Sequence, residues 1–291
     1  MLAVGCLVAG CGATVSGAAS GLHVVAAENF WGSIATQLAG SKATVQSIIV
    51  NPAQDPHSYE PTAADARVLA TAQLAIVNGI GYDPWATRLL AANPASGRIV
   101  LKVGDLFGLG EGQNPHRWYD PADVEPVANA ITGDLKRLDP KDAPYYDRQL
   151  ASFEGTRLEQ YHQVIAAIRK RYAGVVIGAS ESIFALQAPA LGLQLLTPPD
   201  FMKAISEGTD VSAQDAATVE QQITHHEIEV WVYNSQNATP EIQHLNALAR
   251  QYGIRIATVT ETLSPASDNF EQWQVVQLLG IQRALHQATG R

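Results

Sequence analysis

Two histidines each follow a proline directly, in loops that also carry acidic and aromatic residues. His57 lies in the segment DPHSYEPT and His116 lies in NPHRWYDP, each at a predicted junction between a strand and a helix. Proline fixes the local backbone, so both imidazoles stand on stiff stretches of chain. A metal site needs donors that are already held in place, so these two histidines are candidate metal ligands.

Two carboxylates occupy comparable positions in the second half of the chain. Glu181 follows the apolar run VVIGAS, and the pattern predicts that it opens a helix over Ile183–Ala190 capped by Ser180. Glu261 lies in VTETLSP, just beyond a predicted strand. Taken alone, Glu181 is an acid at a helix N-terminus and Glu261 an exposed loop acid. Together with the histidines, they place one donor at each of four strand ends, two from each half.

The cysteines limit what such a metal site can contain. Cys6 and Cys11 are the only two, and both stand within the first dozen residues. The folded body therefore has neither a disulfide nor a thiolate ligand. Any metal in it must be bound by nitrogen and oxygen atoms.

The N-terminal segment, residues 1–21, is apolar and then rich in Gly, Ala and Ser. Its stretch LVAGC resembles a bacterial lipobox, in which the leader is cut before the cysteine and the thiol, here Cys11, is acylated. We expect that the sequence starts inside a longer leader and that the body is extracytoplasmic, anchored to the outer face of the cell membrane as a lipoprotein. Without the lipobox it would be periplasmic. The alternative is an irregular N-terminus with no targeting role.

Composition excludes one class of partner. The chain has 291 residues, 46% of them hydrophobic and 16% charged, with a net charge of −9. It is long enough to bury one large core or two smaller ones. A nucleic-acid surface would need clustered Lys and Arg, which this acidic balance argues against.

Short apolar runs alternate with helical patterns along most of the chain, which is typical of βαβ units and a parallel sheet. Ligands bind such sheets at the carboxyl ends of the strands. In the first half, residues 22–141, we expect strands at 22–27, 43–50, 74–78 and 98–103, with helices near 34–38, 63–72 and 84–90.

A long polar helix is predicted over residues 142–172, interrupted only by Gly155. At 1.5 Å per residue it would reach roughly 40 Å, enough to span a domain. The alternation then resumes over residues 173–291. The predicted fold is therefore α/β, with two lobes that each hold a mostly parallel sheet flanked by helices, joined by one long rigid helix. The second lobe is expected to have strands at 175–179, 194–196, 230–233 and 254–259, with further helices at 213–223, 240–252 and 270–288.

Four segments occur in a recognisable order: DPHSYEPT, NPHRWYDP, GASESIFAL and VTETLSP. This series resembles the solute-binding proteins of zinc- and manganese-family ABC importers. The likeness includes the opening AAENFWGSIATQLAG and the region EGTDVSAQDAATVEQQI. The resemblance implies capture of a divalent metal ion outside the cytoplasm and its delivery to an ABC permease driven by a cytoplasmic ATPase. It also implies a monomer that is not an enzyme.

The resemblance further implies a ligand set. His57 matches the first family ligand and His116 the second. Glu181 stands where the family has glutamate or histidine, and Glu261 where it usually has aspartate. Asp268 is the alternative fourth ligand.

The identity of the metal stays open between manganese and zinc. A glutamate at the third position is typical of manganese-type members, and the segment GDLFGLGEGQN before His116 lacks the histidines common in zinc-type members. Raw affinity nevertheless favours zinc over manganese at a nitrogen and oxygen site.

Three other classes of function are compatible with a metal-binding chain. A metal-dependent hydrolase would need an open coordination position, and the sequence has no HExxH motif. A binder of an organic metal chelate could use the same two-lobed scaffold, and an adhesin could hold a structural metal. Trp31 and Trp118 are predicted to pack beneath the ligand loops. The pair His225-His226 is predicted to precede a strand, where neighbours point to opposite faces, which disfavours a second site.

Overall fold

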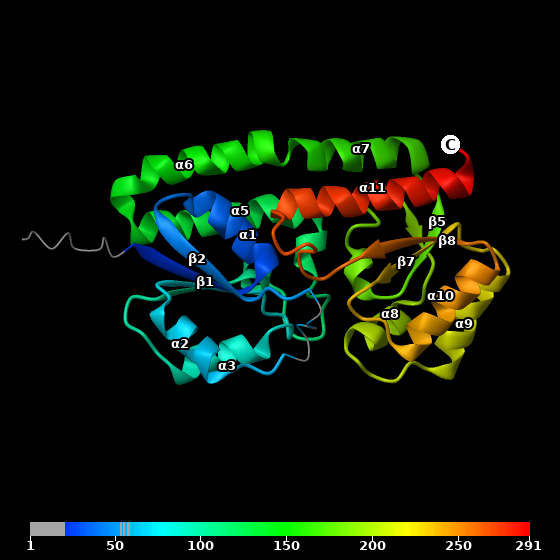
Figure 1. Ribbon diagram of the computed structural model, residues 1–291, viewed down its shortest axis with the longest axis horizontal. Helices are drawn as coiled ribbons and strands as arrows, with labels where there is room; N and C mark the ends of the chain where they lie inside the picture. Colours follow the sequence, from blue (N-terminus) through cyan, green and yellow to red (C-terminus); the bar gives the residue numbers. More distant parts are fainter. Residues whose placement is uncertain (1–20, 53, 55, 57–58) are drawn as a thin grey trace, which may run out of the picture.

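Two α/β lobes lie side by side beneath a long helical segment (Figure 1). The computed structural model describes residues 21–52, 54, 56 and 59–291. Predictions for Cys11 and His57 therefore lie outside the described residues. Among the described helices, none combines the length and apolar character needed to cross a membrane.

The N-terminal lobe is built on a four-stranded parallel sheet in the order β2-β1-β3-β4. Both faces of this sheet are covered, which explains the nearly continuous apolar runs of its central strands β1 and β3. In β1, Val24 and Ala26 face one core cluster, while Val25 and Ala27 face the other. The strands are β1 (Leu22–Glu28), β2 (Ala43–Ile49), β3 (Leu74–Val77) and β4 (Ile99–Lys102).

Helices of the N-terminal lobe divide between the two faces of its sheet. The first face packs against α1 (Asn29–Ala39) and α5 (Pro121–Leu138). The second face packs against α2 (Ala63–Thr71) and α3 (Pro84–Ala92). A capping box at Thr62 and Asp65 fixes the start of α2, since each side chain satisfies a backbone N–H at the helix end. The short helix α4 (Val103–Leu106) follows β4.

The C-terminal lobe repeats this arrangement, with a parallel sheet in the order β6-β5-β7-β8. Its helices are α8 (Pro199–Ser206), α9 (Ala213–Thr224), α10 (Pro240–Gln251) and α11 (Phe270–Thr289). In Figure 1, α11 covers the upper side of this lobe, and α9 and α10 lie on the lower side. The strands are β5 (Val176–Ala179), β6 (Gln194–Leu195), β7 (Val230–Asn234) and β8 (Arg255–Val259).

A helical segment that we call the spine joins the lobes. It consists of α6 (Ala143–Ser152), a π-helical turn at Phe153–Arg157 and α7 (Glu159–Tyr172). The predicted break at Gly155 falls inside the π turn. Helix α11 runs beside α7 (Figure 1), so the last helix of the C-terminal lobe braces the spine. The architecture of two parallel-sheet lobes joined by a long helical segment confirms the predicted fold class. The buried spine residues include Tyr146, Phe153, Tyr161 and Ile168.

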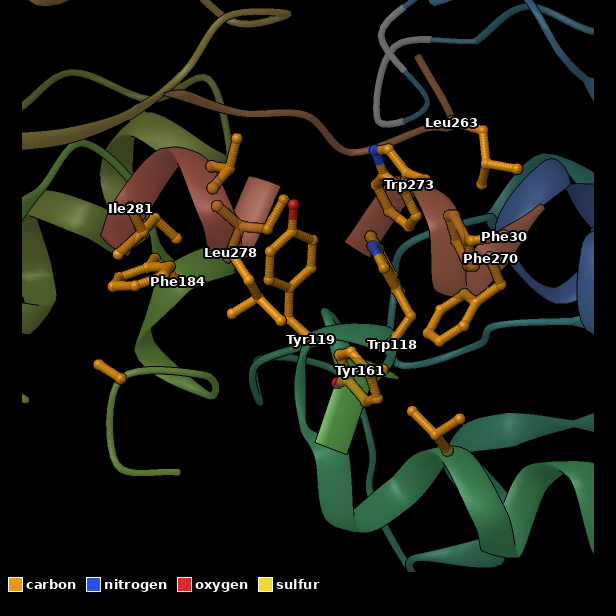
Figure 2. Packing of buried hydrophobic residues seen from close by; sticks show 14 of the residues in the cluster. Phe30, Trp118, Tyr119, Tyr161, Phe184, Leu263, Phe270, Trp273, Leu278 and Ile281 are labelled. Atoms are coloured by element: carbon orange, nitrogen blue, oxygen red, sulfur yellow. The ribbon is translucent and has the colours of Figure 1, made fainter. Parts of the chain in front are cut away.

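Large aromatic side chains fill the region where the two lobes and the spine meet (Figure 2). Phe30 stacks on Trp118 with 3.8 Å between ring centroids and 13° between planes. Trp31 and Trp118 are both fully buried, which confirms that they pack in the core. One hydrophobic cluster includes residues from both lobes and from the spine. The lobes are therefore packed against each other through a common core.

The helix predicted after Glu181 was wrong. The predicted helix over Ile183–Ala190 is a short 3₁₀ turn at Ser182–Ala185 followed by further turns. Pro189 lies inside the predicted stretch and disfavours helical backbone in the residue before it. His225 and His226 precede β7, as predicted; they form the turn that ends α9, and both are exposed.

Candidate metal site

The described candidate ligands come from the carboxyl ends of strands or from the loops beyond them. His116 directly precedes a 3₁₀ turn at Arg117–Tyr119, Glu181 follows β5 and Glu261 follows β8. His116 and Glu181 are 0% exposed, and Glu261 is 2% exposed. Ionisable groups buried this completely are normally paired with other groups. The alternative interpretation of Glu261 as an exposed loop acid is therefore ruled out.

His116 and Glu261 face each other across the two lobes. The distance from His116 Nε2 to Glu261 Oε1 is 4.0 Å. A zinc ion bonds imidazole nitrogen at about 2.0–2.1 Å and carboxylate oxygen at about 2.0–2.2 Å. The two atoms are therefore within the span that one metal ion can bridge.

Glu181 is connected to Glu261 by a shared donor. Asn234, the last residue of β7, donates from Nδ2 to Glu181 Oε2 and to Glu261 Oε1, at 3.1 Å in each case. A further donor, the Tyr82 hydroxyl, lies 2.8 Å from Glu261 Oε2. Two buried carboxylates are thus held close together by neutral donors, an arrangement in which a bound cation would offset their repulsion.

The surroundings of His116 determine which nitrogen faces Glu261. Asn114 Oδ1 accepts from the His116 backbone N–H and lies 2.9 Å from His116 Nδ1. The other end of this amide, Nδ2, donates to the Ser182 carbonyl at 2.7 Å, which fixes the orientation of the amide. Because Oδ1 can only accept, Nδ1 carries the proton. The lone pair of Nε2 is then directed to the side of Glu261, as metal binding requires.

Asn78 anchors the loop that carries His116. Its Nδ2 donates to the Pro115 carbonyl at 2.9 Å, and its Oδ1 accepts from Trp31 Nε1 at 3.0 Å. Both oxygens of Asp83 accept backbone N–H groups, from Asn78 at 2.7 Å and from Gly79 at 2.8 Å. Gly79 has a positive φ of 74°, which glycine adopts without strain. The turn after β3 is therefore a stiff support for the His116 loop.

Glu28 is a buried carboxyl group that sequence reasoning missed. It ends β1, is 0% exposed, and neither of its oxygens has a hydrogen-bond partner within the described residues. Burial raises its pKa well above the ordinary value, and the nearby carboxyls of Asp83 and Glu261 raise it further. Burial also raises the pKa of Asp83, to about 6. A glutamate ending the apolar run LHVVAAE was the available signal.

The remaining candidates occupy other places. Asp268 lies in the turn before α11, where its backbone N–H donates to the Pro265 carbonyl at 3.1 Å. It lines a surface depression with Asn29 and Val50, and of the described ligands His116, Glu181 and Glu261, none lines that depression. Ser180 does not cap a helix, since its hydroxyl accepts from the Asn234 backbone N–H at 3.1 Å. Within the described residues, no group of three or more His, Cys, Asp or Glu is placed to hold a metal, and His57 is outside them.

A family model described as "Zinc-uptake complex component A periplasmic", ZnuA, matches residues 24–284. This match covers most of the chain. The chain belongs to the ZnuA family.

Curated relatives of this ZnuA-family chain are named as metal-binding lipoproteins. A manganese-binding lipoprotein, MntA, of Halalkalibacterium halodurans is 29% identical over 203 residues, 66% of each chain. A metal ABC transporter substrate-binding lipoprotein, FimA, of Streptococcus parasanguinis is 33% identical over 152 residues, 47% of this chain and 48% of its own. The matched segments thus span about half to two thirds of these relatives.

Solved structures share the fold of the ZnuA-family chain. A crystal structure of ZnuA gives a TM-score of 0.74 at 20% identity, over 91% of this chain and 99% of the other. A periplasmic metal binding protein of Candidatus Liberibacter asiaticus gives a TM-score of 0.75 at 20% identity with the same coverage. At this level of identity, the likeness extends to the fold.

Proposed function

We propose that the protein captures a divalent transition-metal ion outside the cytoplasm and delivers it to an ABC-type importer. The observation that carries the proposal is the buried pair of His116 Nε2 and Glu261 Oε1, 4.0 Å apart and contributed by different lobes. Imidazole nitrogen and carboxylate oxygen together suit zinc and manganese. The ion is cargo in this proposal, bound and released without chemical change.

The proposed ligand set is His57, His116, Glu181 and Glu261. Asn234 supports this choice because its amide joins the two carboxylates. Asp268, on a separate depression, is the weaker choice for the fourth ligand. Manganese and zinc are both proposed as cargo, since the donor set admits each.

The remaining parts of the proposal concern the partner and the location of the protein. The ZnuA family comprises substrate-binding transport proteins, so a membrane permease with a cytoplasmic ATPase is the proposed partner. A lipid on Cys11 would anchor the body, a monomer, to the outer face of the membrane. A wide cleft for an organic chelate is not favoured, because His116, Glu181 and Glu261 are at most 2% exposed.

Calorimetric titration of metal-free protein with Mn²⁺ and Zn²⁺ tests the proposal. The wild type should bind one ion tightly, and His57→Ala, His116→Ala and Glu261→Gln should each bind far more weakly. Asp268→Ala is the matched control and should bind like the wild type. Wild-type binding no tighter than millimolar, or normal binding by His116→Ala, would refute the proposed site. If Asp268→Ala loses affinity and Glu261→Gln does not, the fourth ligand is Asp268.

A further inference from the structure

Side chains from other segments form hydrogen bonds with the loop Thr260–Thr262, which carries Glu261. Gln236 Oε1 accepts the backbone N–H groups of Glu261 at 2.7 Å and Thr262 at 3.0 Å. Trp273 Nε1 donates to the Thr260 hydroxyl at 2.8 Å. The backbone that positions Glu261 is therefore fixed by contacts from outside the loop, in addition to its own conformation.

A further contact to this loop, made by Tyr119 of the N-terminal lobe, joins the two lobes. The Tyr119 hydroxyl lies 2.9 Å from the Thr260 carbonyl and 2.9 Å from Gln277 Oε1, and its single proton is shared between these two acceptors. Tyr119 belongs to the 3₁₀ turn that follows His116, and its backbone N–H donates to the His116 carbonyl at 2.9 Å. A short path of covalent and hydrogen bonds thus runs from His116 through Tyr119 and Thr260 to Glu261.

Gln277 fixes this path to α11. Its Oε1 accepts the Thr260 backbone N–H at 2.7 Å as well as the Tyr119 hydroxyl. Because the Thr260 N–H is a donor, the amide oxygen must face it, so the side-chain orientation is determined. Figure 2 shows Tyr119 reaching up to α11 beside Trp273, and their rings meet edge-on with centroids 5.9 Å apart. Tyr119, Thr260 and Gln277 form what we call the inter-lobe hub.

The hub lies in apolar surroundings, where a hydroxyl is costly to bury unless it is hydrogen-bonded. Tyr119 is 0% exposed and belongs to the main hydrophobic cluster. Burial raises the pKa of Tyr119 well above its ordinary value, so the group stays a neutral donor. Packing alone would require only the ring. The hydroxyl adds a fixed distance between the His116 turn and the Glu261 loop.

We propose that Tyr119 is a positioning residue that sets the separation of His116 and Glu261 across the lobes, acting through Thr260 and Gln277. The proposal rests on the proposed function, since it assigns the hub to the metal site. Tyr119 touches no metal in this proposal. It preorganises two ligands, as groups outside the coordination shell do in other metal sites, where their loss typically costs 10- to 100-fold in affinity.

The test is Tyr119→Phe, which keeps the ring and removes the hydroxyl. The dissociation constant for Mn²⁺ or Zn²⁺, measured by calorimetry, should rise by about tenfold. Co²⁺-loaded protein gives a second readout, because its visible absorption bands report the geometry of the ligands; these bands should change in Tyr119→Phe. Tyr146→Phe is the matched control. Tyr146 is equally buried and its hydroxyl bonds Asp139 at 3.2 Å, so its loss should lower thermal stability without changing metal affinity or the Co²⁺ spectrum.

Gln277→Leu keeps the test decisive if Tyr119→Phe folds poorly. This variant removes the acceptor at the other end of the hub and should weaken metal binding to a similar degree. In the double variant the two effects should not add, because both break one unit. Unchanged affinity and an unchanged Co²⁺ spectrum in a folded Tyr119→Phe or Gln277→Leu protein would overturn the proposal. Failure of the wild type to bind any ion would instead refute the proposed function itself.

Discussion

Asn78 offers a sharp test of how the N-terminal lobe supports the candidate site. The residue is 0% exposed, accepts from Trp31 Nε1 and donates to the Pro115 carbonyl next to His116. Asn246 in the C-terminal lobe is the natural control, because it accepts from Trp231 Nε1 at 2.9 Å and is 4% exposed. The two Trp–Asn pairs are chemically alike, and only one of them also holds the His116 loop.

The structure sets the size of each effect. Either alanine variant leaves a buried indole N–H without its acceptor, which costs about 1–3 kcal/mol of stability. Asn78→Ala also loses the bond to Pro115, worth about 0.5–1.5 kcal/mol. The Pro115 carbonyl keeps a second donor, the Arg117 backbone N–H at 2.7 Å, so no further penalty arises there. We expect Asn78→Ala to lose about 1.5–4.5 kcal/mol and Asn246→Ala about 1–3 kcal/mol.

Metal affinity should separate the two variants more clearly than stability does. If the bond to Pro115 holds His116 in place, its loss should weaken metal binding by about two- to tenfold, since 1.4 kcal/mol is tenfold in affinity. Asn246→Ala should bind metal like the wild type. Urea unfolding of the metal-free proteins gives the stabilities, and calorimetry gives the affinities. Equal affinities for the two variants would refute the idea that Asn78 positions His116.

Three further predictions follow from particular contacts. Glu28→Gln should stabilise the metal-free protein at neutral pH. Because the pKa of Glu28 is raised in the folded protein, its contribution to stability is fully present below the pKa of the unfolded chain and is lost as pH rises through the pKa of the folded protein. Thermal melts of wild type and variant should therefore converge toward pH 4 and separate toward pH 8. Gln236→Leu should weaken metal binding in calorimetry. The variant leaves the backbone N–H groups of Glu261 and Thr262 without this acceptor and removes the hydrogen bond from Gln236 Nε2 to the Pro52 carbonyl of the other lobe. Unchanged affinity would contradict this prediction. Phe30→Ala should lower the free energy of unfolding, measured with urea, by about 3–5 kcal/mol, because it removes the ring that stacks on Trp118. A loss below about 1 kcal/mol would show that the neighbouring rings fill the cavity.

Most of the fold was predictable from the sequence. The strand runs of both lobes were placed within one or two residues. The central strands β1, β3 and β7 were the plainest, because strands buried on both faces read as short, nearly continuous apolar runs. The helix prediction for the stretch after Glu181 failed, because the apolar pattern of this stretch suits a helix while Pro189 disfavours one. Local propensity alone could not decide between these two influences.

The supporting groups of the candidate site were much harder to predict. Asn234 and Gln236 look like ordinary polar residues at the end of an apolar run. They become partners of Glu181 and Glu261 only through the parallel register of β5, β7 and β8, which brings distant strand ends together. The burial of Glu261 likewise depends on the other lobe, whose Tyr82 covers its carboxylate. Contacts between lobes leave no periodic signal in the sequence.

The π turn in the spine has a consequence for chain length. Buried residues of the spine are spaced by seven from Tyr146 to Phe153, by eight from Phe153 to Tyr161, and by seven again to Ile168. In a regular α-helix each residue turns the chain by about 100°, so one surplus residue would rotate everything after it away from the core. The wider π turn lies within the eight-residue interval and absorbs that surplus, which keeps one apolar stripe against both lobes. The spine thus contains the equivalent of a one-residue insertion, and removing Gly155 would return it to an unbroken helix without changing which side faces the protein interior.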